Sequence, residues 1–152
     1  QLHLAQSTIP YHLVLWQSKL GGLPYLPKGY EYPKGVQGNP LFLLAQINFE
    51  EVPCLEGFPQ EGILQFYIAD DDFYGANWDN PTQQEGFRVI YFPTISKTED
   101  DLVTDFSFLP EPKGPNKQIK FLSSFFNISL ISTSFCCLCI SNFTNLGISF
   151  RS

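Results

Sequence analysis

The sequence predicts an α+β fold that is strand-rich, with an antiparallel or mixed sheet and short helices, in a domain that is incomplete. Aromatic residues make up 16% of the chain, including fifteen Phe and seven Tyr, and aromatic side chains favour strands. Twelve Pro and eleven Gly divide the chain into short elements that are joined by turns. At 152 residues, the chain has room for one domain with one core.

The strongest strand prediction covers residues 41–45, where Leu-Phe-Leu-Leu-Ala forms a continuous apolar run after a turn signal. A run of this kind is typical of a central strand that is covered on both faces. Residues 63–69 and 87–92 predict the second and third strands in the same way. Gln46 and Gln65 are the polar exceptions of the first two strands, and we expect their amides to hydrogen-bond across the sheet.

A short helix is predicted directly after the first strand. Asn48 is a suitable N-cap, and Glu51 three residues later completes a variant of the capping box. Pro53 stops this helix within about one turn. Elsewhere, residues 11–16 are strand-like in composition, and the acidic residues 98–105 predict a loop or a short helix.

Residues 18–29 predict an ordered loop that lies across the sheet. Two consecutive Gly residues permit unusual backbone angles, and two Pro residues keep the following chain extended. Lys19 and the Gly pair lack the spacing and the strand-to-helix setting of a phosphate-binding loop. The side chains expected to cover the edge of the core are Tyr25, Leu26, Tyr30 and Tyr32.

The net charge of −6 hides a strong asymmetry along the chain. Residues 1–112 contain five basic and fifteen acidic residues, a net charge of −10, whereas residues 113–152 contain four basic residues and no acidic ones. An acidic body repels a phosphate backbone, so we expect no nucleic-acid partner. The abrupt change in composition also indicates that the two parts differ in origin.

We divide the chain into a domain at residues 1–120 and an atypical tail at residues 121–152. Ser and Asn interrupt the apolar stretches of the tail too often for a membrane helix, so no membrane partner is expected. Our hypothesis is that this tail arises from aberrant translation, such as a frameshift. The alternative is a genuine tail that needs a partner. The chain begins at Gln1 and contains no Met, which favours a fragment.

The stretch that follows the second strand is the most suggestive for function. Asp70, Asp72, Tyr74 and Trp78 lie within nine residues, directly past the predicted strand end. Tyr74 occupies a position where a calcium-binding loop carries an oxygen ligand, so we predict a solvated acidic loop and no metal site. Arg88, in the third strand, is expected to pair with a carboxylate of this loop, and the alternative is contact with an anionic ligand.

Four segments, taken in order, resemble the YwqG-like family, bacterial proteins classed as a domain of unknown function. They are Ser-Lys-Leu-Gly-Gly-Leu-Pro-Tyr-Leu-Pro at residues 18–27, Pro-Leu-Phe-Leu-Leu-Ala-Gln-Ile-Asn-Phe at 40–49, Gly-Ile-Leu-Gln-Phe-Tyr at 62–67 and Gly-Phe-Arg-Val-Ile-Tyr at 86–91. The resemblance covers about residues 8–112 and does not extend to the tail. It implies a mixed, strand-rich α+β fold and a soluble cytoplasmic protein, and it brings no activity or catalytic residue. A cytoplasmic location is also expected because no leader opens the chain and Cys54 has no obvious disulfide mate.

We expect the protein to be a binding or interaction module that acts through the aromatic and acidic surface around Asp72, Tyr74 and Trp78. Its partner is an unknown protein or a small ligand. The alternative is a hydrolase or metal-dependent enzyme that uses residues 70–72 with Arg88. No nucleophile elbow, metal motif or paired histidines support that alternative, so the sequence leaves enzymatic activity open and predicts no cofactor.

Overall fold

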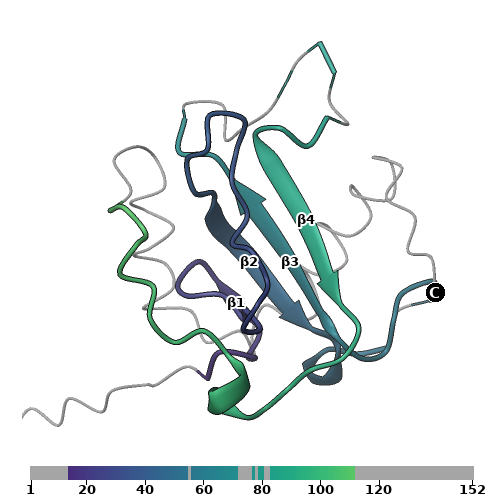
Figure 1. Ribbon diagram of the computed structural model, residues 1–152. Coiled ribbons are helices and arrows are strands. Elements are labelled where there is room, and N and C mark those ends of the chain that lie inside the picture. Colours follow the sequence, from purple (N-terminus) through teal and green to yellow (C-terminus); the bar gives the residue numbers. More distant parts are fainter. Residues whose placement is uncertain (1–13, 55, 72–76, 78, 81–82, 112–152) are drawn as a thin grey trace, which may run out of the picture.

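The computed structural model describes residues 14–54, 56–71, 77, 79–80 and 83–111. Within these residues, four strands form one antiparallel sheet in the order β1-β2-β3-β4, so neighbours along the chain are also neighbours in the sheet (Figure 1). The elements in chain order are β1 (Lys19–Leu20), β2 (Phe42–Asn48), η1 (Phe49–Glu51), β3 (Ile63–Ile68), β4 (Phe87–Phe92) and η2 (Glu99–Asp101).

The predicted short helices are wrong for the described residues, which contain no α-helix. η1 and η2 are single turns of 3₁₀ helix. The N-cap prediction is confirmed, because the Asn48 side chain accepts a hydrogen bond from the N–H of Glu50 at 3.0 Å. The predicted capping box is wrong, because the Glu51 carboxylate accepts from the N–H of Ser18 and the N–H of Asn48 donates to Ser18 Oγ. Pro53 follows so closely that a 3₁₀ turn fits where an α-helix does not. The described chain is therefore mostly sheet, and of the two sheet types predicted, the antiparallel one is observed.

A β-bulge explains why the central apolar run does not alternate. β2 pairs with β3 along its length, and the register shifts between Leu43 and Ala45. Leu43 belongs to the hydrophobic cluster on one face of the sheet and Ala45 to the cluster on the other, although side chains two residues apart normally share a face. The predicted burial of this strand on both faces is confirmed.

The first strand lies later in the chain than the strand-like composition of residues 11–16 indicated. Residues 14–17 form a turn in which the N–H of Gln17 donates to the carbonyl of Val14 at 3.1 Å. β1 follows and pairs antiparallel with β2, with Lys19 opposite Gln46. Residues 11–13 are outside the part of the chain that the structure describes.

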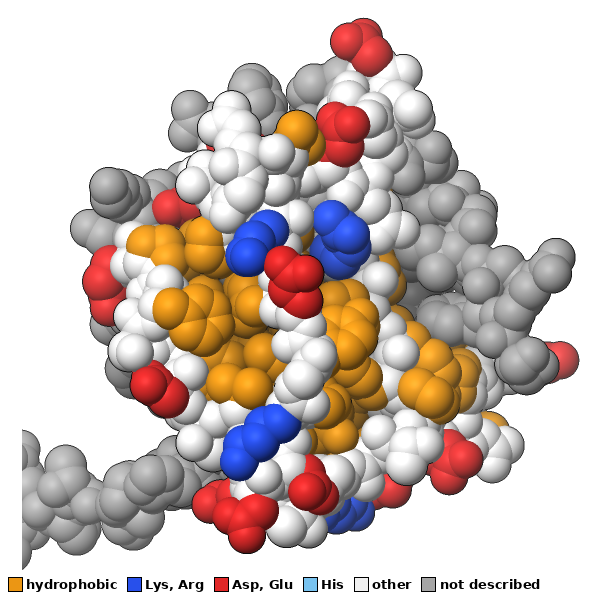
Figure 2. Space-filling model, in the orientation of Figure 1, with side chains coloured by type: hydrophobic (Ala, Val, Ile, Leu, Met, Phe, Trp, Pro, Cys, Tyr) orange, Lys and Arg blue, Asp and Glu red, His pale blue; other side chains and the backbone are white. Residues whose placement is uncertain are grey.

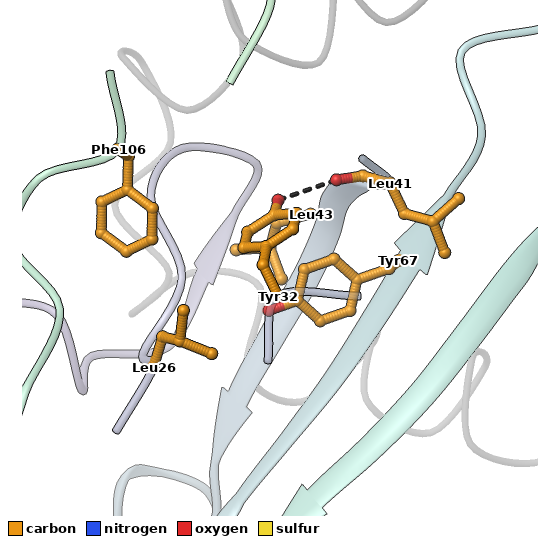
Figure 3. Packing of buried hydrophobic residues seen from close by; sticks show 6 residues of the cluster. All are labelled: Leu26, Tyr32, Leu41, Leu43, Tyr67 and Phe106. Atoms are coloured by element: carbon orange, nitrogen blue, oxygen red, sulfur yellow. Dashed lines mark hydrogen bonds between the residues drawn. The ribbon is translucent and has the colours of Figure 1, made fainter. Parts of the chain in front are cut away.

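One face of the sheet, which we call the front face, is covered by two irregular segments, residues 24–33 and 95–109. The backbone N–H groups of Lys28 and Val103 join these segments by hydrogen bonds to the carbonyls of Asp101 and Leu26. Figure 3 shows how their side chains meet those of the sheet. The cluster consists of Leu26, Tyr32, Leu41, Leu43, Tyr67 and Phe106.

The Tyr32 ring is the centre of this cluster. It meets the Tyr67 ring edge-on, with 5.8 Å between ring centroids, and its hydroxyl donates to the carbonyl of Leu41 at 2.7 Å (Figure 3). The hydroxyl is therefore satisfied inside an apolar setting, which a buried polar group needs. Burial raises the pKa of Tyr32 and of Tyr67 well above the usual value, so both stay neutral at physiological pH.

The opposite face, which we call the back face, carries a second cluster. Its buried residues are Ala45, Phe49, Leu64 and Phe66. Val89 and Tyr91 of β4 pack against them, as does Phe58 from the link between β2 and β3. In the part of the chain that the structure describes, no helix has the length and apolarity to span a lipid bilayer.

Candidate functional site

Of the five residues proposed from the sequence, the structure describes two. Asp70 comes directly after β3 and is half-buried, and Arg88 is the second residue of β4. Asp72, Tyr74 and Trp78 lie outside the described residues. The predicted convergence of the five side chains therefore stays a prediction.

Arg88 makes a different contact from the one expected. Its Nη2 donates to the backbone carbonyl of Lys34 at 3.2 Å, and its Nε is buried without a hydrogen-bond partner. The ion pairs between described residues are Lys34–Glu31 and Lys97–Glu50, so no described carboxylate pairs with Arg88. The guanidinium of Arg88 therefore attaches the turn that begins at Lys34 to strand β4. This role is structural.

The described residues show a different feature, an aromatic surface on the front of the molecule. We use this name for Tyr30, Tyr32, Phe92, Phe106 and Phe108. The Phe108 ring lies 5.4 Å from Tyr32 and 6.0 Å from Phe106, and the Tyr30 ring lies 5.0 Å from Phe92, measured between centroids. Tyr30 is 47% exposed and Phe108 is 52% exposed, whereas the other three rings are buried.

This surface combines exposed rings with a rigid support. Each exposed ring packs against a buried ring of the core, Tyr30 against Phe92 and Phe108 against Tyr32, and this packing fixes its position. Figure 2 shows apolar side chains gathered on this side of the molecule, with acidic and basic side chains between and around them. Glu31, which lies between Tyr30 and Tyr32 in the sequence, forms an exposed ion pair with Lys34, with 3.0 Å between the charged atoms. An apolar centre with a polar rim is typical of recognition surfaces.

Beneath the front segments lies a network of buried amides that is satisfied by its own neighbours. Gln46 and Gln65 are opposite each other in β2 and β3, and Gln65 Nε2 donates to Gln46 Oε1 at 2.7 Å. The same oxygen accepts from the N–H of Tyr25 at 2.8 Å, and the Tyr67 hydroxyl donates to Gln65 Oε1 at 3.0 Å. The predicted amide pair is confirmed. The amide pair also hydrogen-bonds the backbone of Tyr25, so it attaches the front segment to the sheet. Its donors and acceptors are engaged within the protein and are not left for a ligand.

Lys19 is a buried cation that the sequence did not mark as unusual. Its side chain is 4% exposed, and Nζ donates to the carbonyl of Leu23 at 2.7 Å and of Val14 at 3.5 Å. These contacts close the turn around the Gly pair, so the buried amine holds this loop in place from the inside. Desolvation lowers the pKa of Lys19 to about 8, opposed by the nearby charge of Glu51.

This shift gives a pH prediction. Because the folded state releases the Lys19 proton near pH 8 and the unfolded state only near 10.5, the unfolded state binds more protons between these values and stability rises with pH. We expect the free energy of unfolding to rise by about 2 kcal/mol between pH 7 and pH 10 in the native chain, relative to a Lys19→Met variant. Urea unfolding at a series of pH values measures this difference. Parallel pH profiles for the two chains would contradict it.

The chemistry open to the described residues is limited. No group of three or more His, Cys, Asp or Glu side chains in the described ranges is placed to hold a metal ion. The hydroxyls of Tyr32 and Tyr67 both donate hydrogen bonds, and burial raises the pKa of both. The feature that these residues do offer is a contact surface.

Sequence reasoning found part of the aromatic surface. Tyr30 and Tyr32 were expected to cover the edge of the core, and they do. Phe106 and Phe108 were not singled out. They lie at a turn, in which the N–H of Leu109 donates to the carbonyl of Phe106. Because Phe106 is buried and Phe108 is exposed, an alternating pattern does not separate the buried ring from the exposed one.

A comparison with protein families gives one match. A family model described as "Domain of unknown function (DUF1963)" matches residues 18–143. The match includes all four strands and continues past residue 120, into the segment predicted to be an atypical tail. No curated protein matches the chain.

Proposed function

We propose that this chain, which belongs to the DUF1963 family of domains of unknown function, acts as a binding or interaction module whose partner is a protein. The observation that carries the proposal is the aromatic surface, in which Tyr30 and Phe108 are about half exposed while resting on buried rings. Rigid aromatic side chains lose little conformational entropy on binding, and they are enriched in the centres of interfaces.

The charge of the body supports a partner with a basic rim. Residues 1–112 carry a net charge of −10, and this acidity disfavours nucleic acid and anionic membranes as partners. The second recognition surface, which the sequence predicts around Asp72, Tyr74 and Trp78, lies outside the described residues and stays a separate prediction.

Two serine substitutions test the proposal. We expect a Tyr30→Ser, Phe108→Ser variant to lose about tenfold or more of its affinity for a specific protein partner, because two anchoring rings are removed. The measurement is quantitative capture of proteins from cells that make this protein, with tagged native and variant chains, followed by binding titration of each captured protein. Leu23→Ser is the matched control, since Leu23 is also 47% exposed but belongs to the turn that Lys19 closes.

The result that contradicts this proposal is equally definite. If every protein held by the native chain is held equally well by the double variant, the aromatic surface is not the binding site. Circular dichroism of both variants shows whether a loss reflects binding or unfolding.

A separate experiment tests the alternative that the protein is an enzyme. A hydrolase or metal-dependent enzyme would use Asp70 and Asp72 with Arg88. The described hydrogen bond of Arg88 goes to the backbone carbonyl of Lys34. A divalent cation held by this loop would raise the melting temperature of the native chain, because it stabilises the folded state alone. A screen of divalent cations that leaves the melting temperature unchanged removes the metal-dependent form of this alternative.

Three finer assignments complete the proposal. The four sequence segments support a YwqG-like member of the family and a bacterial source. Cys54, the cysteine of the described region, carries an exposed free thiol, which supports a reducing compartment such as the cytoplasm.

A further inference from the structure

The two segments that cover the front face carry more acidic than basic side chains. Residues 24–33 and 95–109 together contain five acidic and two basic residues, a net charge of −3, and all five acidic residues are exposed. They are Glu31, Glu99, Asp100, Asp101 and Asp105. Figure 2 shows acidic side chains around the apolar centre on this side of the molecule. The aromatic surface therefore lies in an acidic setting.

The described cations leave most of this acidity uncompensated. Lys97, one of the two basic residues of these segments, pairs at 2.7 Å with Glu50, which lies outside them. Among the described residues, no Lys or Arg side chain forms an ion pair with the four carboxylates of residues 99–105. These carboxylates therefore attract a positively charged group that approaches the front of the molecule from solvent.

Glu31 places one carboxylate next to an exposed ring. It directly follows Tyr30, its side chain is 82% exposed, and its carboxylate already holds one cation, the Lys34 ammonium, at 3.0 Å. An exposed ion pair of this kind contributes at most about 1 kcal/mol, so a cation from a partner can replace the ammonium at little cost. The neighbouring Tyr30 ring is half exposed, and the face of an aromatic ring attracts a cation as well.

We propose that the aromatic surface binds a basic, arginine-containing segment of a partner protein, in which an Arg side chain stacks on an exposed ring and pairs with Glu31. This inference rests on the proposed function and adds the chemistry of the partner to it. Arg meets both requirements, because its planar guanidinium stacks on aromatic faces and binds a carboxylate through two parallel hydrogen bonds. The Lys ammonium is more strongly hydrated and lacks this geometry.

The exposed Phe108 ring indicates that the partner segment also carries apolar side chains. Phe108 is 52% exposed and is supported by the buried rings of Tyr32 and Phe106. A wholly charged partner would leave this ring in water, whereas an apolar side chain next to the Arg removes its surface from water. We therefore expect a segment that combines basic and apolar residues.

Selection from a library of short random peptides tests the chemistry of the partner. Phage that display the peptides are bound to the immobilised full chain, and the composition of the retained peptides is compared with that of the unselected library. We expect Arg to be enriched roughly threefold, with apolar residues next to it, because Arg and apolar side chains form the anchors of such interfaces. Retained peptides without enriched Arg, or no peptide retained above background, would overturn the inference.

Matched charge variants locate the binding site of the selected peptides. Glu31→Gln with Asp105→Asn removes two charges from the front and keeps a side-chain acceptor for the N–H of Ser107. Glu56→Gln with Glu61→Gln removes two charges from the exposed link between β2 and β3. In titration calorimetry, we expect the front variant to bind about tenfold more weakly than the native chain and the link variant to stay within about twofold of it. Equal losses would show that net charge alone attracts the peptides, which would overturn the inference.

The Tyr30→Ser, Phe108→Ser variant separates a failure of this inference from a failure of the proposed function. If the selected peptides are poor in Arg and bind the front charge variant normally, but are lost from the double serine variant, the surface binds proteins and only the basic chemistry is wrong. If Arg-rich peptides bind the double serine variant as tightly as the native chain, both the inference and the proposed function are contradicted.

Discussion

Replacing Gln46 with Leu is expected to lower the free energy of unfolding by about 4 kcal/mol, a severe loss for a domain of this size. Gln46 Oε1 accepts from the N–H of Tyr25 and from Gln65, and Nε2 donates to the carbonyls of Leu15 and Gln17 at 2.8 and 2.7 Å. Leu has a similar volume but offers none of these bonds. Buried donors and acceptors are then left without partners, and the front segment loses its attachment to the sheet.

Urea unfolding measures this loss, and the exposed Gln60 provides the control. Gln60→Leu is expected to change stability by less than about 0.5 kcal/mol, because its amide faces water in both states. A loss of similar size in both variants would show that the buried network has no special energetic role.

A double-mutant cycle identifies the contribution of the amide pair. Gln65→Leu alone removes the partner of Gln46 and leaves the Tyr67 hydroxyl without its acceptor. Because the two glutamines share one hydrogen bond and one set of neighbours, we expect the double variant to lose less than the sum of the single losses, by about 1 kcal/mol or more. Strict additivity would contradict a shared network.

Replacing Gly62 with Ala is the second substitution with a large expected effect, a loss of about 3 kcal/mol. Gly62 precedes β3 with φ at +92°, where a side chain is strained. A Cβ there would lie 2.5 Å from the carbonyl oxygen of Phe92 and 2.8 Å from the Tyr91 ring. Strain at positive φ costs roughly 1–2 kcal/mol and overpacking roughly a further 1–3 kcal/mol.

Gly57→Ala separates these two costs. Gly57 has a similar φ of +83°, but a Cβ built on it meets no heavy atom within 4 Å. We expect this variant to lose only about 1 kcal/mol, which is the conformational cost alone. Thermal or urea unfolding of the two variants checks the comparison, and equal losses would mean that the close approach between residue 62 and β4 is relaxed at no cost.

The parts of the fold that depend on residues close together in the sequence were predicted correctly. Residues 87–92 were expected to form a strand and do so as β4 without a change of boundary. The Asn48 cap followed from one side chain and the backbone two residues later. Residues 63–69 were also close to the observed β3, because a run of buried β-branched and aromatic side chains fits a pleated sheet.

The errors arose where local signals were compatible with two structures. The capping pattern before Pro53 agrees with an α-helix or with a 3₁₀ turn, and the number of residues before the proline decided between them. Residues 14–16 have strand-like composition but form a turn, since β1 pairs with β2 only from Lys19 onward. Pairing is a long-range interaction, so composition alone did not locate it.

The contacts of the candidate functional residues were the hardest feature to predict from the sequence. Arg88 was expected to reach a carboxylate, and its described contact is the backbone carbonyl of Lys34. The aromatic surface joins residues 30–32 to residues 106–108, which are far apart in the sequence. Its existence depends on the packing of two irregular segments side by side over the sheet.

By itself, the sequence determined strands β2, β3 and β4, the amide pair of Gln46 and Gln65 and the acidity of the body, because these depend on residue type, spacing and charge. β1 lies within residues 18–29, which were predicted to form a loop. Only the tertiary structure decided which side chains are buried or exposed on each face. It placed Lys19 in the interior with a lowered pKa, and it left Tyr30 and Phe108 half exposed on buried rings. Burial depends on every segment that packs nearby, and no stretch of sequence contains that information alone.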